Sequence, residues 1–159
     1  MEDAVVSIPG IQLTDSEPLV GYFAEIASLP MYNDEVIRWH SDDKDTRKAC
    51  RHIEEVTGIN FKRTRNIDKA EIITERGNPG SRLWDGVARW SSDDPVWRIT
   101  VRKNKKYQST VLHELAHALG MDHPENHWKE RDTIMSYKRD KTITKLFPKD
   151  IDILTGLYF

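Results

Sequence analysis

Alternating hydrophobic and polar positions predict a series of short strands in the first two thirds of the chain. Residues 59–64 (INFKRT) place apolar and polar side chains in turn, which is the period of a strand with one buried face. Residues 70–74 (AEIIT) form a shorter and more apolar run, which also predicts a strand. Three further segments have a similar character, and the full set of predicted strands is 35–40, 59–64, 70–74, 86–90 and 96–103.

A helix is predicted in residues 41–58, where apolar residues recur at helical spacing. Ser41 is the expected N-cap, and Gly58 is expected to end the helix because glycine accepts the left-handed conformation there. His52 should lie on the polar face. The residues of the apolar stripe are Ala49, Cys50, Ile53 and Val56.

Two more helices are predicted in the last third of the chain. One is expected to be capped by Ser109 and to end at Leu119, with its apolar side packed on a sheet. The other should begin with Pro148, a residue that suits the first turn of a helix. The positions expected to be buried are Leu112, Leu115, Ala116 and Leu119 in the former and Ile151, Leu154 and Leu157 in the latter.

Residues 1–30 differ from the rest because prolines and glycines interrupt any long periodicity, so we expect an irregular segment with a short helix over 19–29. We predict an N-terminal extension, 1–30, that could cover a cleft, and a single domain, 31–159.

Composition excludes several classes of protein. A net charge of -2 and a pI of about 6.3 give no general attraction to nucleic acid or to acidic membranes, and we expect a monomer that binds neither. The lone Cys50 rules out an intramolecular disulfide. The first residues, MEDAVVSIPG, are acidic and lack a long apolar core, so we expect no signal peptide. The chain would act in the cytoplasm or be released without such a signal; it would be secreted if a leader has been removed.

The strongest chemical signal is the run HELAHALGMDH. His113 and His117 are i and i+4 on the predicted helix, so their imidazoles project from one face toward a single ion. Gly120 can take the left-handed conformation that turns the chain back, and His123 then supplies a third nitrogen. Three imidazoles with one open position are typical of a catalytic zinc, whereas structural zinc sites usually have four protein ligands. Glu114 lies close enough to the open position to carry a proton between water and a leaving amine.

These residues resemble the HExxHxxGxxH signature of the metzincin clan of zinc peptidases, and TIMSY (133–137) resembles the clan's Met-turn. The chain is most similar to a minimal matrixin-like or serralysin-like catalytic domain. The resemblance implies an α+β fold, with a twisted mixed sheet of about five strands, an active-site helix, a backing helix and a C-terminal helix. It also implies that Met135 forms an apolar floor under the zinc ligands. Tyr137 would be a second catalytic residue, which in serralysins and astacins can bind the metal and stabilise the oxyanion. Many relatives carry an inhibitory segment that lays a Cys or Asp onto the zinc, and Asp15 or Glu17 could act in this way here.

The same resemblance implies how substrate binds. A peptide in an extended cleft would pair antiparallel with an edge strand, which we expect in residues 85–91, and residues 138–145 would form one wall of a substrate pocket. The cofactor is one catalytic zinc ion; calcium at Asp85, Asp93 or Asp94 is an unsupported alternative. The predicted activity is zinc-dependent endopeptidase. Two alternatives stay open: a catalytically silent binding protein with a metallopeptidase fold, and a zinc amidase that acts on a non-protein amide.

Overall fold

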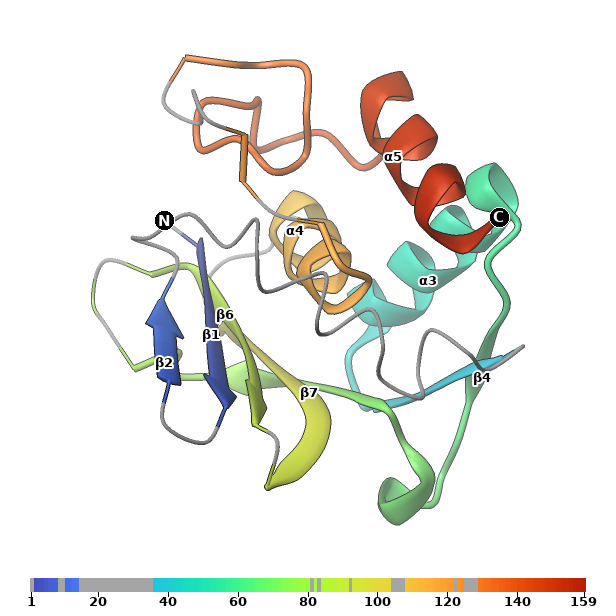
Figure 1. The fold of residues 1–159 in the computed structure, drawn as a ribbon, viewed down its shortest axis with the longest axis vertical. Helices are drawn as coiled ribbons and strands as arrows, with labels where there is room; N and C mark the ends of the chain where they lie inside the picture. Colours follow the sequence, from blue (N-terminus) through green and yellow to red (C-terminus); the bar gives the residue numbers. More distant parts are fainter. Residues whose placement is uncertain are drawn as a thin grey trace.

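A mixed sheet of seven strands forms one layer of the molecule (Figure 1). The computed structural model describes residues 36–80, 82, 84–91, 93–103, 108–121, 123–124 and 129–159, together with the backbone of 2–8 and 11–14. The strands are β1 (Glu2–Ile8), β2 (Ile11–Thr14), β3 (Ile37–Ser41), β4 (Phe61–Arg63), β5 (Ile72–Gly77), β6 (Gly86–Ser91) and β7 (Asp94–Arg102). Their order in the sheet is β2-β1-β6-β7-β5-β3-β4.

The direction of the strands separates two parts of the sheet. β4, β3, β5 and β7 are parallel, and β6 returns antiparallel to β7. β1 then pairs parallel to β6, and β2 pairs antiparallel to β1. The five strands predicted from the hydrophobic pattern are all present, and the predicted α+β fold with a mixed sheet is confirmed.

The N-terminal strands were not predicted. Residues 1–30 were expected to be irregular, yet Glu2–Ile8 and Ile11–Thr14 form a hairpin in which Ile8 pairs with Ile11. Only Pro9 and Gly10 separate the two strands in the sequence, and these residues are among those that interrupt the periodicity. The helix expected over 19–29, and Asp15 and Glu17, lie outside the described residues.

Helices α3 (Lys44–Thr57), α4 (Gln108–Ala118) and α5 (Pro148–Tyr158) form the other layer, and a short 3-10 turn, η1 (Ile67–Lys69), follows β4. Helix α4 packs on β1, β6 and β7; α3 packs beside α4, and α5 contacts α3 (Figure 1). Trp97 and Ile99 from the sheet and Leu112, Leu115 and Leu119 from α4 and the turn after it are completely buried. None of the described helices has the length and apolarity needed to cross a membrane.

The ends of α3 and α5 depart from prediction in two ways. Asp43, not Ser41, is the N-cap of α3: its carboxylate accepts from the Asp45 N–H, while the Ser41 hydroxyl accepts from the Asp43 N–H. In α5, Leu154 is buried as predicted, but the side chain of Leu157 is 43% exposed. In that last turn Tyr158 packs against the core instead, and its hydroxyl donates to the Leu119 carbonyl.

Candidate active site

The turn after α4 is built by the sequence Leu119-Gly120-Met121. The Gly120 N–H donates to the His117 carbonyl, and the Met121 N–H donates to the Ala116 carbonyl, which together make a Schellman motif. Gly120 has φ 106, so the predicted left-handed residue is found there. The turn sends the chain back over the helix, and His123 returns to the face that carries the other two histidines.

The structure brings His113, His117 and His123 together. Nε2 of His113 lies 3.1 Å from Nε2 of His117 and 3.3 Å from Nε2 of His123. Nitrogen ligands held roughly 2.0–2.1 Å from a tetrahedral zinc ion lie roughly 3.3 Å from each other. The spacing of the three nitrogens therefore fits one ion. Of all the side chains that the structure describes, these histidines alone form such a ligand cluster.

Backbone carbonyls orient two of the imidazoles. His113 Nδ1 lies 2.9 Å from the Ile134 oxygen, and His117 Nδ1 lies 3.0 Å from the Met121 oxygen. A carbonyl oxygen can only accept, so each Nδ1 carries the proton and each Nε2 of a neutral ring has a free lone pair. Two buried lone pairs that face each other at 3.1 Å repel unless a cation lies between them. The donor set therefore fits a metal ion.

Burial favours the neutral, metal-binding form of these rings. His113 and His117 are fully buried. Burial is the largest cause that lowers the pKa of His113 well below its ordinary value, and nearby positive charge, above all on His117, lowers this pKa further. A metal thus meets little competition from protons at neutral pH.

Glu114 lies on the side of α4 that faces β6. It is fully buried, and its carboxylate comes close to Gly86 at the start of that strand: a Cβ added to Gly86 would lie 3.2 Å from Oε1 of Glu114 and 3.1 Å from Cγ2 of Thr110. A contact this short would force one of the neighbours to move. Gly86 is thus a position where the absence of a side chain makes room for Glu114. The sequence pattern did not identify this role.

The Met-turn (Thr133–Tyr137) lies beside the histidines. Met135 is 1% exposed and belongs to the hydrophobic core, and the carbonyl of its neighbour Ile134 accepts from His113. The ring of Tyr137 is 4.8 Å from that of His123 and 6.4 Å from that of His113, measured between centroids. Tyr137, selected from the sequence, is therefore at the histidine cluster.

Two polar residues near the Met-turn were missed by sequence reasoning. Arg139 is 3% exposed, and its guanidinium donates to the carbonyls of Ser136 and Ser109. Asp150, in the first turn of α5, is fully buried and accepts hydrogen bonds from the Met-turn. An acidic residue in the first turn of a helix is common because it interacts favourably with the helix dipole. The sequence around Asp150 therefore did not indicate a second role for this residue.

Ser109 has a role different from the predicted one. It lies inside α4 rather than before it, and its hydroxyl donates to the Lys141 carbonyl at 2.8 Å. This bond ties the first turn of α4 to the chain that follows the Met-turn. The calcium site considered at Asp85, Asp93 and Asp94 stays untested; Asp94 makes an ion pair with Arg98.

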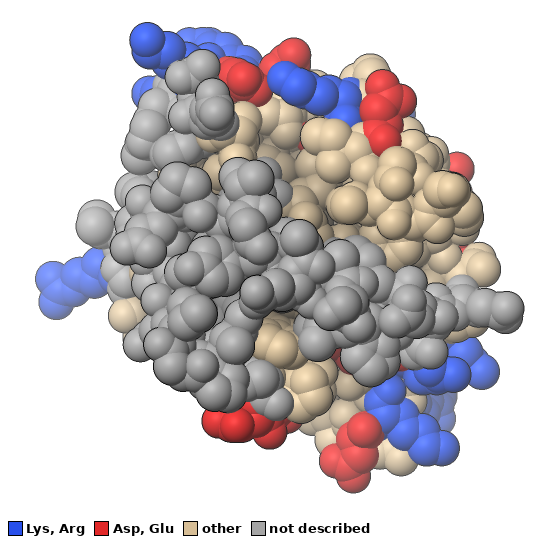
Figure 2. Space-filling view, viewed as in Figure 1, with Lys and Arg blue, Asp and Glu red and all other residues tan. Residues whose placement is uncertain are grey.

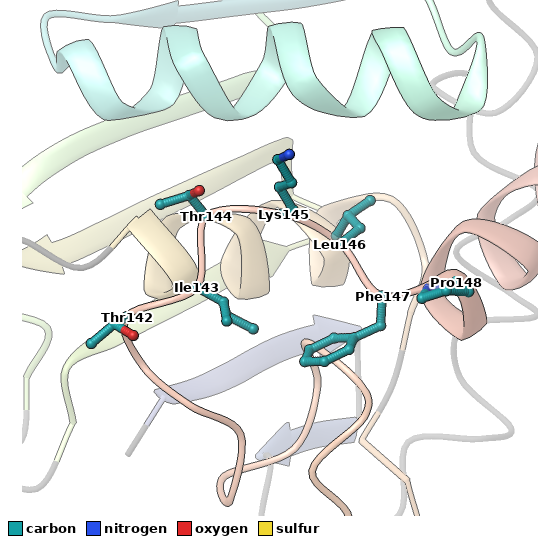
Figure 3. Close-up of a pocket in the computed structure, with 7 residues that line it drawn as sticks. All are labelled: Thr142, Ile143, Thr144, Lys145, Leu146, Phe147 and Pro148. Carbon is teal, nitrogen blue, oxygen red and sulfur yellow. The ribbon is translucent and has the colours of Figure 1, made fainter.

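A pocket of about 400 Å³ follows the chain between the Met-turn and α5. Its lining overlaps the second half of the predicted substrate wall, residues 138–145. Ile143 and Phe147 point toward one another on one side of this loop, and Lys145 points to the other side, toward α3 (Figure 3). The lining residues are Thr142, Ile143, Thr144, Lys145, Leu146, Phe147 and Pro148.

One expectation about the sheet is wrong. Residues 85–91 were expected to contain an edge strand, but β6 lies between β7 and β1, and the edges of the sheet are β2 and β4. The five strands from residues 37–102 would leave β6 at an edge; the unpredicted β1 covers it over Glu2–Ser7.

Charged residues of both signs lie on the face of the molecule that Figure 2 shows. Among the described residues drawn there, Lys and Arg are interspersed with Asp and Glu around the rim (Figure 2).

Comparison with known proteins identifies the family to which this chain belongs. No curated protein matches the chain. The model of the Astacin family of peptidases matches residues 31–149, which is more than half of the chain. Astacins are metzincins, so the clan predicted from the histidine motif is confirmed, with astacin as the matching family rather than the matrixins or serralysins used for comparison. The chain therefore belongs to the astacin family of zinc metallopeptidases.

Proposed function

We propose that this protein is an endopeptidase in which His113, His117 and His123 hold a single zinc ion and Glu114 is the general base. The observation that carries the proposal is the convergence of the three Nε2 atoms at 3.1 and 3.3 Å, with the Nδ1 protons of two rings directed at carbonyls. A bound zinc ion supplies a Lewis acid that polarises the scissile carbonyl and makes water more acidic.

Glu114 moves the proton. Its carboxylate takes a proton from the attacking water as the water oxygen bonds to the carbonyl carbon, and it returns that proton to the amine nitrogen as the C–N bond breaks. The burial of Glu114 supports this role, because a carboxylate screened from bulk water interacts more strongly with the reacting atoms.

Tyr137 stabilises the oxygen that becomes negative. The ring contact with His123, 4.8 Å between centroids, supports a phenol near the histidines that donates a hydrogen bond to this oxygen. Replacing Tyr137 with Phe should lower kcat by roughly 10²-fold and leave KM nearly unchanged, because the bond forms mainly in the transition state.

Cleavage of a peptide library tests the activity directly. The purified chain is incubated with the library with zinc, with a chelator, and as the Glu114→Gln variant, and the products are sequenced. We expect internal cuts only in the first case. Cuts that persist with chelator would overturn the zinc mechanism. Release of terminal residues alone would replace endopeptidase with exopeptidase, and no cleavage of peptides would favour an amidase or a silent binding protein.

The N-terminal hairpin covers the strand that substrate would use. β1 pairs with β6 from Glu2 to Ser7, and a peptide that adds a strand to β6 needs the same N–H and C=O groups. The pairing of β1 is parallel, opposite to the antiparallel direction expected of substrate. The extension thus lowers activity until it is displaced.

Proline variants test this cover. Proline at both Ala4 and Val5 removes two successive N–H groups, of which one points toward β6. We expect kcat/KM for a long peptide to rise, whereas Gln12→Pro, in a strand that pairs only with β1, should have a smaller effect. An unchanged kcat/KM in the double variant would contradict the covering role.

A further inference from the structure

Asp150 is a buried carboxylate that accepts hydrogen bonds from three directions. Oδ1 accepts from the Thr133 hydroxyl at 2.6 Å, and Oδ2 accepts from the N–H groups of Ile134 at 2.9 Å and Phe147 at 3.0 Å. It is 0% exposed. The bond from Phe147 is the usual one between a first-turn acid and the N-cap backbone. The other two cross to the Met-turn and have no part in capping α5.

The hydrogen bonds continue from Thr133 toward the histidine cluster. The Thr133 oxygen, which donates its proton to Asp150, accepts from the Met135 N–H at 3.2 Å. That N–H shares a peptide group with the Ile134 carbonyl, which accepts from His113 Nδ1 at 2.9 Å. Asp150 and His113 are thereby joined through one hydroxyl and one peptide group.

All hydrogen bonds in this series run in one direction. The imidazole N–H donates to the carbonyl, the peptide N–H donates to the hydroxyl oxygen, and the hydroxyl donates to the carboxylate. Hydrogen bonds aligned in series polarise one another, and a negative charge at the accepting end strengthens this effect. The result at the other end is a ring with a fixed orientation and a more electron-rich Nε2.

His117 offers a contrast within the same site. Its Nδ1 donates to the Met121 carbonyl in the turn directly after α4, so the helix and its own C-terminal turn orient this ring. His113 has its carbonyl partner 21 residues away, in a segment of irregular backbone. The Met-turn must therefore be held in place by another element, and α5 does this through Asp150.

We propose that Asp150 is a positioning residue for His113, acting through Thr133 and the Ile134–Met135 peptide to orient the ring and to strengthen its Nε2 as a metal ligand. The proposal rests on the proposed zinc ligation and adds a carboxylate far along the chain to that site. Changes to groups that support metal ligands typically lower metal affinity 10- to 100-fold.

Two variants interrupt the series at different bonds. Asp150→Asn removes the negative charge, and Thr133→Val removes the hydroxyl while keeping a similar volume. Thr133→Ser keeps the hydroxyl and should restore the series. Asp43→Asn is a matched control, because it also changes a carboxylate that accepts a backbone N–H at a helix N-terminus, but at α3.

Zinc affinity, measured by chelator competition, is the first readout. We expect the dissociation constant to rise roughly 10- to 100-fold in Asp150→Asn and Thr133→Val and to stay near the parent value in Thr133→Ser and Asp43→Asn. The second readout is the His113 Nδ1–H proton resonance of the zinc-loaded protein, which should move only in the first two variants. The Thr133→Ser variant, which keeps the hydroxyl, should leave this resonance at its position in the parent protein.

The outcomes separate this proposal from the proposed function. If the parent chain binds zinc and cleaves peptides while both variants keep its zinc affinity and its His113 resonance, Asp150 does not position His113. The proposed zinc site is then unaffected. If Asp150→Asn does not fold, Thr133→Val decides the question. If the parent chain itself binds no zinc, the proposed zinc ligation is wrong, and the positioning role of Asp150, which depends on it, is wrong as well.

Discussion

Helices α3 and α4 lie side by side, but they achieve their stability in different ways. The sequence of α3 contains its own boundaries, an Asp43 cap and Gly58 with φ 81, and it buries one stripe while charged residues face solvent. In α4 every side chain from Ser109 to Ala118 is buried, including two histidines and a glutamate. Buried polar groups of this kind reduce the stability of a helix unless they are paired. Helix α3 thus contributes to the fold through one buried stripe, whereas α4 buries two histidines and a glutamate that fit the proposed metal site.

The largest expected difference comes from removing a histidine in each helix. His117→Ala should abolish stoichiometric zinc binding and with it peptide cleavage, since only two of the three imidazoles are left. His52→Gln, in α3, should bind one zinc ion per chain like the parent. Metal analysis of the two purified variants measures the zinc content of each. Full zinc content in His117→Ala would remove that residue from the ligand set.

The next largest difference is expected between variants of two glutamates, the buried Glu114 in α4 and the half-buried Glu54 in α3. Glu114→Gln should lower kcat by roughly 10²- to 10⁴-fold while zinc is retained, because the amide cannot take up the proton. Glu54→Gln, in α3, removes a charge from a side chain that accepts the Phe61 N–H, and its kcat should stay near that of the parent. Steady-state kinetics on one peptide compares the two. Equal kcat values in both variants would show that Glu114 is not the base.

Two glycine substitutions test whether β6 positions the carboxylate of Glu114. Gly86→Ala should lower kcat/KM by roughly 10- to 100-fold without loss of zinc, since the added methyl group displaces the carboxylate. Gly77→Ala is the control in β5, where the new Cβ would meet only Thr100 Cγ2 at 3.5 Å, an ordinary contact. If the two alanine variants have the same kcat/KM, β6 does not position the base.

The smallest predicted effect is a pH dependence from α3. His52 was expected on a polar face, but it is half-buried, and its Nε2 accepts from the Leu146 N–H at 2.9 Å. Burial lowers the pKa of His52 below its ordinary value of 6.5. As the pH falls below 6.5, the unfolded chain therefore takes up a proton before the folded chain does, and the free energy of unfolding decreases until the folded pKa is passed.

His52→Gln isolates this contribution because the amide oxygen can accept the same N–H without titrating. Between pH 7.5 and 5 the parent should lose a few tenths of a kcal/mol more stability than the variant, because solvent screens a half-exposed ring. Urea unfolding with chelator present measures this difference without a contribution from metal release. Parallel pH profiles would show that His52 does not titrate differently in the folded state.

The sequence by itself determined the parts of the site that depend on local geometry. The i and i+4 spacing of His113 and His117 places both rings on one face of any helix, and Gly120 permits the turn that brings His123 back. The strand pattern was likewise local, so all five strands between residues 37 and 102 were found.

Only the tertiary structure decided what lies across from these local elements. Gly86 and Glu114, Asp150 and the Met-turn, and β1 and β6 meet through packing of segments that are far apart in sequence. Periodicity describes which face of an element is buried but not which element covers it, so a buried acid in a first helical turn has the same pattern as an exposed one. For the same reason Pro9 and Gly10 could be recognised as breaks, while the pairing of the strands on either side could not.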